Sequence, residues 1–153
     1  QFEMVRLGIG LYGIDPAEKL QKQLQVVGTL KTVISQIREV KSHETVGYSR
    51  RGTVQRDSQI AVVAIGYADG LNRKLGNGKG YMVVNGQKAP IVGSICMEMT
   101  MIDVTGINCR EGDEVIVLGK EVDINEMATK IGTIPYEVLT GISQRVKRIY
   151  FYE

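Results

Sequence analysis

Apolar and polar residues are arranged along this 153-residue chain in short segments that favour strands over long helices. Leu30 to Val40 is rich in Val and Ile with imperfect alternation, which is typical of a strand. Ile60 to Ile65 is a short apolar run that ends at Gly66, and such a run suits a strand buried on both faces. Glu114 to Leu118 predicts a further strand. Arg145 to Tyr152 alternates charged and apolar residues, as a final strand would.

The clearest local signal is the dipeptide Asn85-Gly86, which stands between the apolar segments Met82-Val84 and Gln87-Val92. Asn and Gly both tolerate the positive φ values of a type I′ turn. The pattern therefore predicts a β-hairpin.

Two short helices are expected near the C-terminus. Asp123 followed three residues later by Glu126 resembles a capping box, and Gly132 can end the helix. Pro135 is the residue type favoured at a first helical position, so a second helix is expected to start there.

Many short strands with turn signals and only two small helices favour an all-β architecture over alternating strands and helices. We expect a mainly β fold, a Greek-key-like barrel or sandwich with two short helices. Residues 1–13 form an apolar opening segment, residues 14–28 are mostly polar and suit a linker, and residues 29–153 form the β domain.

Composition excludes several partners. The chain has 19 Lys and Arg against 17 Asp and Glu, and the two signs are interspersed, which does not suggest nucleic acid. The longest apolar run is far shorter than the roughly 20 residues of a membrane span, so we expect a soluble, cytoplasmic protein. Cys96 and Cys109 lie far apart and His43 is single, so we expect reduced thiols and no metal site.

Tyrosines beside glycines or at element starts are the candidate chemical features. They occur in Val46-Gly47-Tyr48-Ser49, Gly66-Tyr67-Ala68-Asp69-Gly70 and Pro135-Tyr136-Glu137. Glycine next to an aromatic residue lets backbone or ligand approach closely, although a half-buried packing role is the commoner fate of a single tyrosine. No Ser/His/Asp set, paired carboxylates or Walker-type phosphate loop can be assembled. These residues alone indicate a β domain without a defined activity.

Five blocks in a fixed order carry a family resemblance that covers nearly the whole chain. The blocks are Arg6 to Gly13, Gly47-Tyr48, Gly66 to Gly70, Gly93-Ser94-Ile95-Cys96-Met97-Glu98 and Pro135-Tyr136-Glu137-Val138. In this order the chain resembles the C-terminal part of alanine racemases, which use pyridoxal 5'-phosphate. The resemblance implies an N-terminal (β/α)8 barrel that holds the cofactor on a lysine outside this chain. It also implies that residues 1–13 are the last strand of that barrel, and that two chains form a homodimer with shared active sites.

The resemblance implies a catalytic role for Tyr48, which matches the tyrosine that transfers the substrate α-proton on the face opposite the lysine. A phenol needs nearby positive charge or hydrogen bonds to ionise usefully near neutrality. Arg6 matches an arginine that donates to the pyridine nitrogen of the cofactor. Because a guanidinium does not readily give up its proton, the ring stays a weaker electron sink, which favours racemisation over transamination.

Further residues are implied to bind cofactor and substrate. Gly8 and Ile9 match residues whose backbone amides bind the cofactor phosphate, and Tyr136 matches a tyrosine that hydrogen-bonds the same group. Met97 matches a residue whose amide meets the substrate carboxylate. Tyr67 and Arg73 match residues that line the access to the site.

Three positions depart from the family pattern. Ser94 stands where arginine is usual, Glu98 where aspartate is usual, and Gln144 where tyrosine is common. These departures leave the reaction class intact and put the electrostatics of the access, and the substrate preference, in question.

The expected function is the interconversion of L- and D-alanine for D-alanine biosynthesis and peptidoglycan precursors of the cell wall, an isomerase activity of the full-length parent. The chain alone is expected to be inactive because it lacks the cofactor lysine. Alternatives are another amino-acid racemase, a decarboxylase of the same two-domain plan, or a non-catalytic β-barrel binding module.

Overall fold

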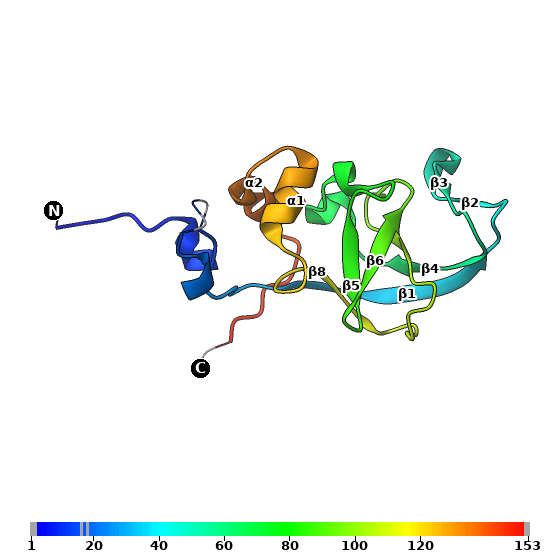
Figure 1. Ribbon diagram of the computed structural model, residues 1–153, viewed down its shortest axis with the longest axis horizontal. Coiled ribbons are helices and arrows are strands. Elements are labelled where there is room, and N and C mark those ends of the chain that lie inside the picture. Colours follow the sequence, from blue (N-terminus) through cyan, green and yellow to red (C-terminus); the bar gives the residue numbers. More distant parts are fainter. Residues whose placement is uncertain (1–2, 16, 18, 152–153) are drawn as a thin grey trace.

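A closed antiparallel barrel forms the centre of the computed structural model, which describes residues 3–15, 17 and 19–151 (Figure 1). Its strands are β1 (Leu30–Val40), β4 (Ser58–Val63), β5 (Tyr81–Val84), β6 (Gln87–Val92), β7 (Thr100–Asp103) and β8 (Glu114–Leu118). Around the barrel their order is β1-β4-β7-β6-β5-β8, with β8 returning to β1. The expected mainly β fold is confirmed, as a barrel and not a sandwich.

Strand β1 closes the barrel because it pairs with two partners. Its first half, Leu30 to Val33, lies against β8, and its second half, from Ile34 to Val40, lies against β4. The register shifts between Ile34 and Gln36 where the partner changes. Closure pairs strands that would otherwise expose free edges. The predicted strand over Leu30 to Val40 is confirmed.

The predicted hairpin is also confirmed. Val84 pairs with Gln87, and the turn residues Asn85 and Gly86 have φ values of 47° and 76°. The strand predicted over Ile60 to Ile65 is present as β4, shifted two residues toward the N-terminus, and Glu114 to Leu118 forms β8. The sequence did not predict β7 or the two-residue strands β2 (Thr45–Val46) and β3 (Gly52–Thr53).

The barrel interior is filled by branched and long apolar side chains. In β5, Met82, Val83 and Val84 are all buried, as expected for a strand that lies between the barrel interior and the covering elements. Fully buried side chains from the other strands complete this core: Ile34, Val63, Ile91, Ile102, Val115 and Val117.

Helices α1 (Ile124–Ile131) and α2 (Pro135–Gly141) pack together over one end of the barrel (Figure 1). The Asp123 carboxylate accepts a hydrogen bond from the Asn125 amide at 3.0 Å, and Gly132 ends α1 with a φ of 74°. Pro135 is the first residue of α2. Both predicted helices are confirmed.

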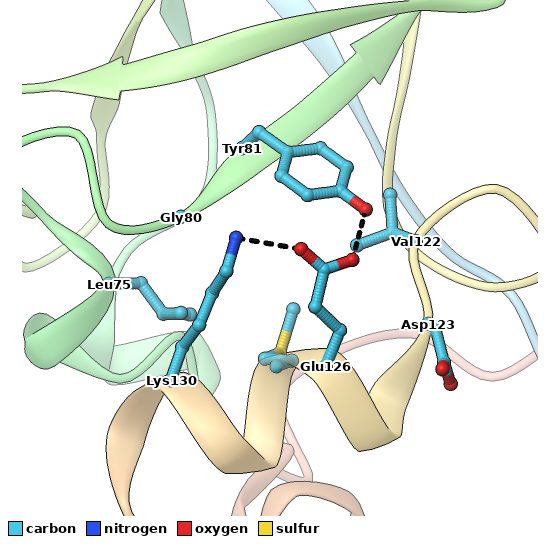
Figure 2. Close-up of a pocket in the computed structure, with 8 residues that line it drawn as sticks. Leu75, Gly80, Tyr81, Val122, Asp123, Glu126 and Lys130 are labelled. Atoms are coloured by element: carbon cyan, nitrogen blue, oxygen red, sulfur yellow. Dashed lines mark hydrogen bonds and ion pairs between the residues drawn. The ribbon is translucent and has the colours of Figure 1, made fainter.

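Glu126 does not complete the predicted capping box, because its carboxylate faces the barrel (Figure 2). The Tyr81 hydroxyl donates to Glu126 at 2.7 Å, and the Lys130 ammonium lies 2.8 Å from the same carboxylate. The ammonium groups of Lys88 and Lys130 lie 4.1 and 4.8 Å from the centre of the Tyr81 ring. Attraction of these cations to the ring and to the carboxylate anchors α1 on β5.

Short 3-10 helices complete the described structure. They lie at Ile9–Tyr12, Gln21–Gln23, Tyr48–Arg50, Tyr67–Asp69 and Arg73–Leu75. Residues 3–8 pair with no strand among the described residues. Strand partners of residues 1–13 would belong to the barrel that the resemblance implies, so their assignment to a last barrel strand stays a prediction.

The final strand predicted over Arg145 to Tyr152 is wrong for the described residues 145–151, none of which belongs to a strand. The closed barrel offers this segment no free edge to pair with. Instead, the Arg148 guanidinium donates to the carbonyls of Ile142, Ser143 and Val146. Phe151 remains 88% exposed.

Within the described ranges, no helix has the length and apolar character needed to cross a membrane.

The Tyr81–Glu126–Lys130 cluster predicts a pH dependence of stability. The ion pair with Lys130, followed by the Tyr81 hydroxyl, lowers the pKa of Glu126. The carboxylate therefore stabilises the fold above the pKa of an unfolded glutamate, about 4.3, and this stabilisation is lost as pH falls through the lower folded pKa. On acidification from pH 6 to 3, the wild type should lose more free energy of unfolding than Glu126→Gln.

Urea denaturation at both pH values measures the difference between the two proteins. Because the pair is partly exposed, we expect a difference below about 1 kcal/mol. Equal losses in the two proteins would show that the carboxylate does not anchor α1.

Candidate active site

Tyr48 lies at the tip of the turn between β2 and β3, at one end of the molecule (Figure 1). The turn needs positive φ at Gly47, Ser49 and Arg50, with values of 75°, 57° and 54°. It rests on a small apolar cluster separate from the barrel core: Val46, Val54, Ile60 and Met101. The Tyr48 side chain is 74% exposed. A phenol displayed on a strained turn is placed for a ligand or partner, and it is not packing the core.

The Gly66 to Gly70 turn is joined through its backbone to the loop that carries Met97. The Tyr67 amide donates to the Cys96 carbonyl at 3.0 Å, and the Ala68 amide donates to the Met97 carbonyl at 2.9 Å. A Cβ at Gly66 would lie 2.3 Å from the Met97 carbonyl oxygen. Glycine is therefore required at position 66 for two backbone segments to approach this closely.

The Met97 carbonyl accepts a hydrogen bond from the Ala68 amide, and the Met97 amide is left available to a ligand. The Cys96 amide donates to the Met99 carbonyl at 3.0 Å, so the loop turns tightly around Met97. In the part of the chain that the structure describes, the Met97 amide has no hydrogen-bond acceptor. The Met97 side chain is 55% exposed. The geometry suits a backbone amide that donates to a ligand oxygen.

Tyr67 and Arg73 lie side by side next to this loop. The Arg73 guanidinium is 5.8 Å from the centre of the Tyr67 ring, a cation–π distance. Burial raises the pKa of the nearby Cys96 thiol, and the positive charge of Arg73 opposes that rise. Cys96 is therefore mostly in its thiol form at neutral pH, which argues against a nucleophilic thiolate.

Two hollows in the surface differ greatly in size. The one beside Tyr81 and Glu126 has about 10 Å³, no more than the space of one water (Figure 2). The other has about 410 Å³ and runs between Tyr67, Arg73 and helix α2, where Glu137 and Val138 line it. Only the larger groove has room for a small ligand.

Arg145 joins the turn and the loop through two ion pairs. Its Nε lies 2.8 Å from Oδ1 of Asp69, and its Nη2 lies 2.9 Å from Oε1 of Glu98. The other Asp69 oxygen accepts the Gly66 amide at 2.9 Å. Glu98, the departure from aspartate, thus has a defined partner.

The residues implied in phosphate binding also meet. A Cβ at Gly8 would lie 2.5 Å from the Tyr136 hydroxyl oxygen, so this hydroxyl occupies the space beside the Gly8 backbone. Gly8 caps the 3-10 helix Ile9–Tyr12, and its carbonyl accepts the first hydrogen bond of that helix from the Leu11 amide. The amides of Gly8 and Ile9 are not used in this bond. We call Gly8, Ile9 and Tyr136 the cradle. Its amides and hydroxyl form a set of donors that suits an anion.

Arg6 and two of the departures take no part in these contacts. Arg6 is exposed and forms no ion pair with any described residue. Ser94 is buried, and its carbonyl accepts the Cys96 thiol at 3.7 Å. Gln144 is exposed.

The structure therefore sorts the predicted residues into separate groups. The turn that carries Tyr67 and the loop that carries Met97 are connected by the backbone hydrogen bonds Tyr67–Cys96 and Ala68–Met97, and Cys96 also packs against the apolar cluster under Tyr48. The cradle lies at the opposite end of the molecule, beside α2 and the N-terminal segment (Figure 1). Within one chain, Tyr48 and the cradle do not face a common ligand.

Sequence reasoning missed the roles of Asp69 and Arg145. An aspartate three residues after Gly66 is a signal for a side-chain cap of a tight turn, and Asp69 does cap this turn. No local signal identifies Arg145, because its partners lie 76 and 47 positions away, at Asp69 and Glu98.

The close approach at Gly66 generates a test. Gly66→Ala should lower the free energy of unfolding by about 1–3 kcal/mol, since the new methyl group forces two backbone segments apart. Gly28→Ala is the matched control, because a Cβ at Gly28 meets nothing within 4 Å. Chemical denaturation compares the two variants, and similar small changes in both would disprove the tight contact.

Comparison with known proteins places this geometry in a family. The chain is 45% identical to alanine racemase 2 of Caldanaerobacter subterraneus subsp. tengcongensis, over 98% of this chain and 40% of that protein. It is also 45% identical to the alanine racemase of Vibrio cholerae, over 99% of this chain and 43% of that protein. The chain thus spans about 40% of the length of the curated relatives it matches.

Solved structures agree. Alanine racemase from Bartonella henselae, with covalently bound pyridoxal phosphate, has a TM-score of 0.88 and 38% identity over 94% of this chain and 40% of that one. Alanine racemase from the D-cycloserine producer Streptomyces lavendulae has a TM-score of 0.91 and 29% identity over 99% of this chain and 42% of that one. Residues 27–150 match the family model described as alanine racemase, C-terminal domain. The chain therefore belongs to the alanine racemase C-terminal domain family.

Proposed function

We propose that the parent of this chain interconverts L- and D-alanine, using pyridoxal 5'-phosphate, and supplies D-alanine for peptidoglycan precursors. The observation that best supports this proposal is the placement of an exposed Tyr48 at one end of the domain and of the cradle, which suits an anion, at the other. A racemase needs a proton-transferring group on one face of the substrate and a fixed cofactor on the other. Family membership supplies the reaction class.

The residues of the cradle fit the phosphate of this cofactor. Any side chain at Gly8 would collide with the Tyr136 hydroxyl, so a glycine here keeps backbone donors accessible beside a phenolic donor. Backbone amides and a hydroxyl are common donors to a phosphate. When bound, the cofactor supplies the electron sink that makes the substrate α-proton removable.

The remaining candidate site residues of this chain bind and orient the substrate and the cofactor. Tyr48 holds or accepts the α-proton at its phenolic oxygen, and the Met97 amide donates to the substrate carboxylate. Arg6 would donate to the ring nitrogen of the bound cofactor, and that nitrogen would then stay unprotonated. Tyr67 and Arg73 line the access from the groove, where a guanidinium attracts the carboxylate of an incoming amino acid.

We propose a homodimer with shared active sites because the two groups of residues are separated within one chain (Figure 1). A second copy related by a two-fold axis, with the two chains running in opposite directions, would bring its Tyr48 and Met97 to the cradle of the first. Such an isologous pairing gives two equivalent sites. We place the enzyme in the cytoplasm, and we propose that this chain alone is inactive because the cofactor lysine lies outside it.

Enzymes with the same two-domain plan can act on other amino acids, so the substrate preference of the parent is one test of the proposed function. The full-length parent should racemise alanine faster than serine, and it should neither racemise nor decarboxylate lysine and ornithine. Chiral chromatography of the amino acids and assay of released carbon dioxide measure both reactions. Release of carbon dioxide would indicate a decarboxylase, and a preference for another amino acid would indicate a different racemase. Absence of any turnover would favour a binding module.

Tyr48→Phe in the full-length parent tests the proton-transfer role. Removal of a general acid-base group typically costs 10²–10⁴-fold in rate, so kcat should fall by at least about 100-fold. Tyr150→Phe is the matched control, because Tyr150 is also 74% exposed and lies on the C-terminal segment. Near-normal kcat in Tyr48→Phe would exclude Tyr48 as the base.

The sharing of sites can be tested by complementation between Tyr48→Phe and Gly8→Val subunits carrying different affinity tags. A purified hybrid dimer should have about half the activity of the wild type, because one of its two sites is fully intact. If Tyr48 and the cradle served the same site within one chain, every hybrid site would carry a defect. The hybrid would then be as inactive as the two parent variants.

A further inference from the structure

Arg145 occupies a central position between three segments that are remote in sequence. Its ion pairs reach Asp69 in the Gly66 to Gly70 turn and Glu98 in the Met97 loop, while its own backbone follows α2. The backbone near it is also connected, because the Ser143 amide donates to the Asp69 carbonyl at 3.0 Å. A Cβ at Gly70 would lie 2.3 Å from the Gly141 carbonyl. The three segments therefore meet at close quarters around one guanidinium.

The two carboxylates differ in exposure and in what else they hold. The Asp69 side chain is 13% exposed and already binds the Gly66 amide, so it belongs to the frame of the turn. The Glu98 side chain is 57% exposed, and its contact with Arg145 is its link to the turn. A guanidinium fork can donate to both carboxylates at once, whereas an ammonium cannot match this geometry.

We propose that Arg145 is a positioning residue. It clamps the Met97 loop to the Gly66 to Gly70 turn and so fixes the direction of the Met97 amide. The proposal deepens the proposed function, because the Met97 amide is the group that would meet the substrate carboxylate. Arg145 acts through Glu98 on a backbone loop, and it touches no substrate. The glutamate at position 98, which departs from the family pattern, is the side chain through which this clamp reaches the loop.

The clamp makes a prediction that does not depend on the reaction. In the full-length protein, Arg145→Gln should speed hydrogen exchange at the Tyr67 and Ala68 amides by about tenfold or more, because these amides donate to the Met97 loop. Arg148→Gln is the matched control. Arg148 lies on the same segment, but it donates to the carbonyls of Ile142, Ser143 and Val146. Equal exchange rates in the two variants would overturn the clamp.

The second readout is kinetic and uses alanine as substrate. Arg145→Gln should raise KM by about tenfold with a smaller change in kcat, since an amide that moves relative to its ligand weakens ground-state and transition-state binding alike. Glu98→Gln should show the same split in milder form. The double variant Arg145→Gln/Glu98→Gln should have nearly the same KM as Arg145→Gln alone, because the two residues form one contact. Arg145→Lys should recover part of the loss, through the contact with Asp69.

The outcomes separate this inference from the proposed function. If the wild-type parent does not racemise alanine, the proposed function fails while hydrogen exchange still tests the clamp. If racemisation is normal and Arg145→Gln leaves KM unchanged, or if Arg148→Gln raises KM equally, the clamp is wrong. If Arg145→Gln does not fold, Glu98→Gln and Arg145→Lys decide by the same readouts, and an unchanged KM in both overturns the proposal.

Discussion

Strand β1 pairs with β8 along its first half and with β4 along its second half, and the remaining structure depends on this double pairing. Closure gives every barrel strand a hydrogen-bonded neighbour on both sides and encloses a core of branched side chains. The loops that leave such a barrel start from fixed positions. Functional side chains can then lie on strained turns, because the barrel supplies the stability that the turns lack.

The loops use backbone contacts more than side-chain contacts to hold their positions. The Gly66 turn and the Met97 loop are joined carbonyl to amide, and the absence of a side chain at Gly66 makes this approach possible. The same principle applies at Gly8, where the Tyr136 hydroxyl fills the space that a Cβ would take. Charged side chains reinforce this frame at a few points. Arg145 does so between turn and loop, and Glu126 does so between α1 and β5 (Figure 2).

The separation of Tyr48 from the cradle has a physical meaning for function. The barrel lies between the β2–β3 turn on one side and α2 with the N-terminal segment on the other (Figure 1), so Tyr48 and the cradle of one chain cannot close on one small ligand. A second copy solves this problem through symmetry, since each chain can offer one end to its partner. Under the proposed function, the domain contributes to two sites and completes neither by itself. Association would then be a condition of activity.

The sequence by itself determined the local structure wherever one residue type has a strong conformational preference. Asn85-Gly86 predicted the hairpin, Asp123 and Gly132 predicted the ends of α1, and Pro135 predicted the start of α2. The order of the tyrosines and glycines along the chain also indicated the family. Tertiary structure decided the rest. Barrel closure left residues 145–151 without a free strand edge, and the packing of α1 against β5 placed the Glu126 carboxylate on the Tyr81 hydroxyl instead of at its expected cap. The partners of Arg145 came from three-dimensional proximity alone, because the energy of an ion pair depends on distance in space and not on separation in sequence.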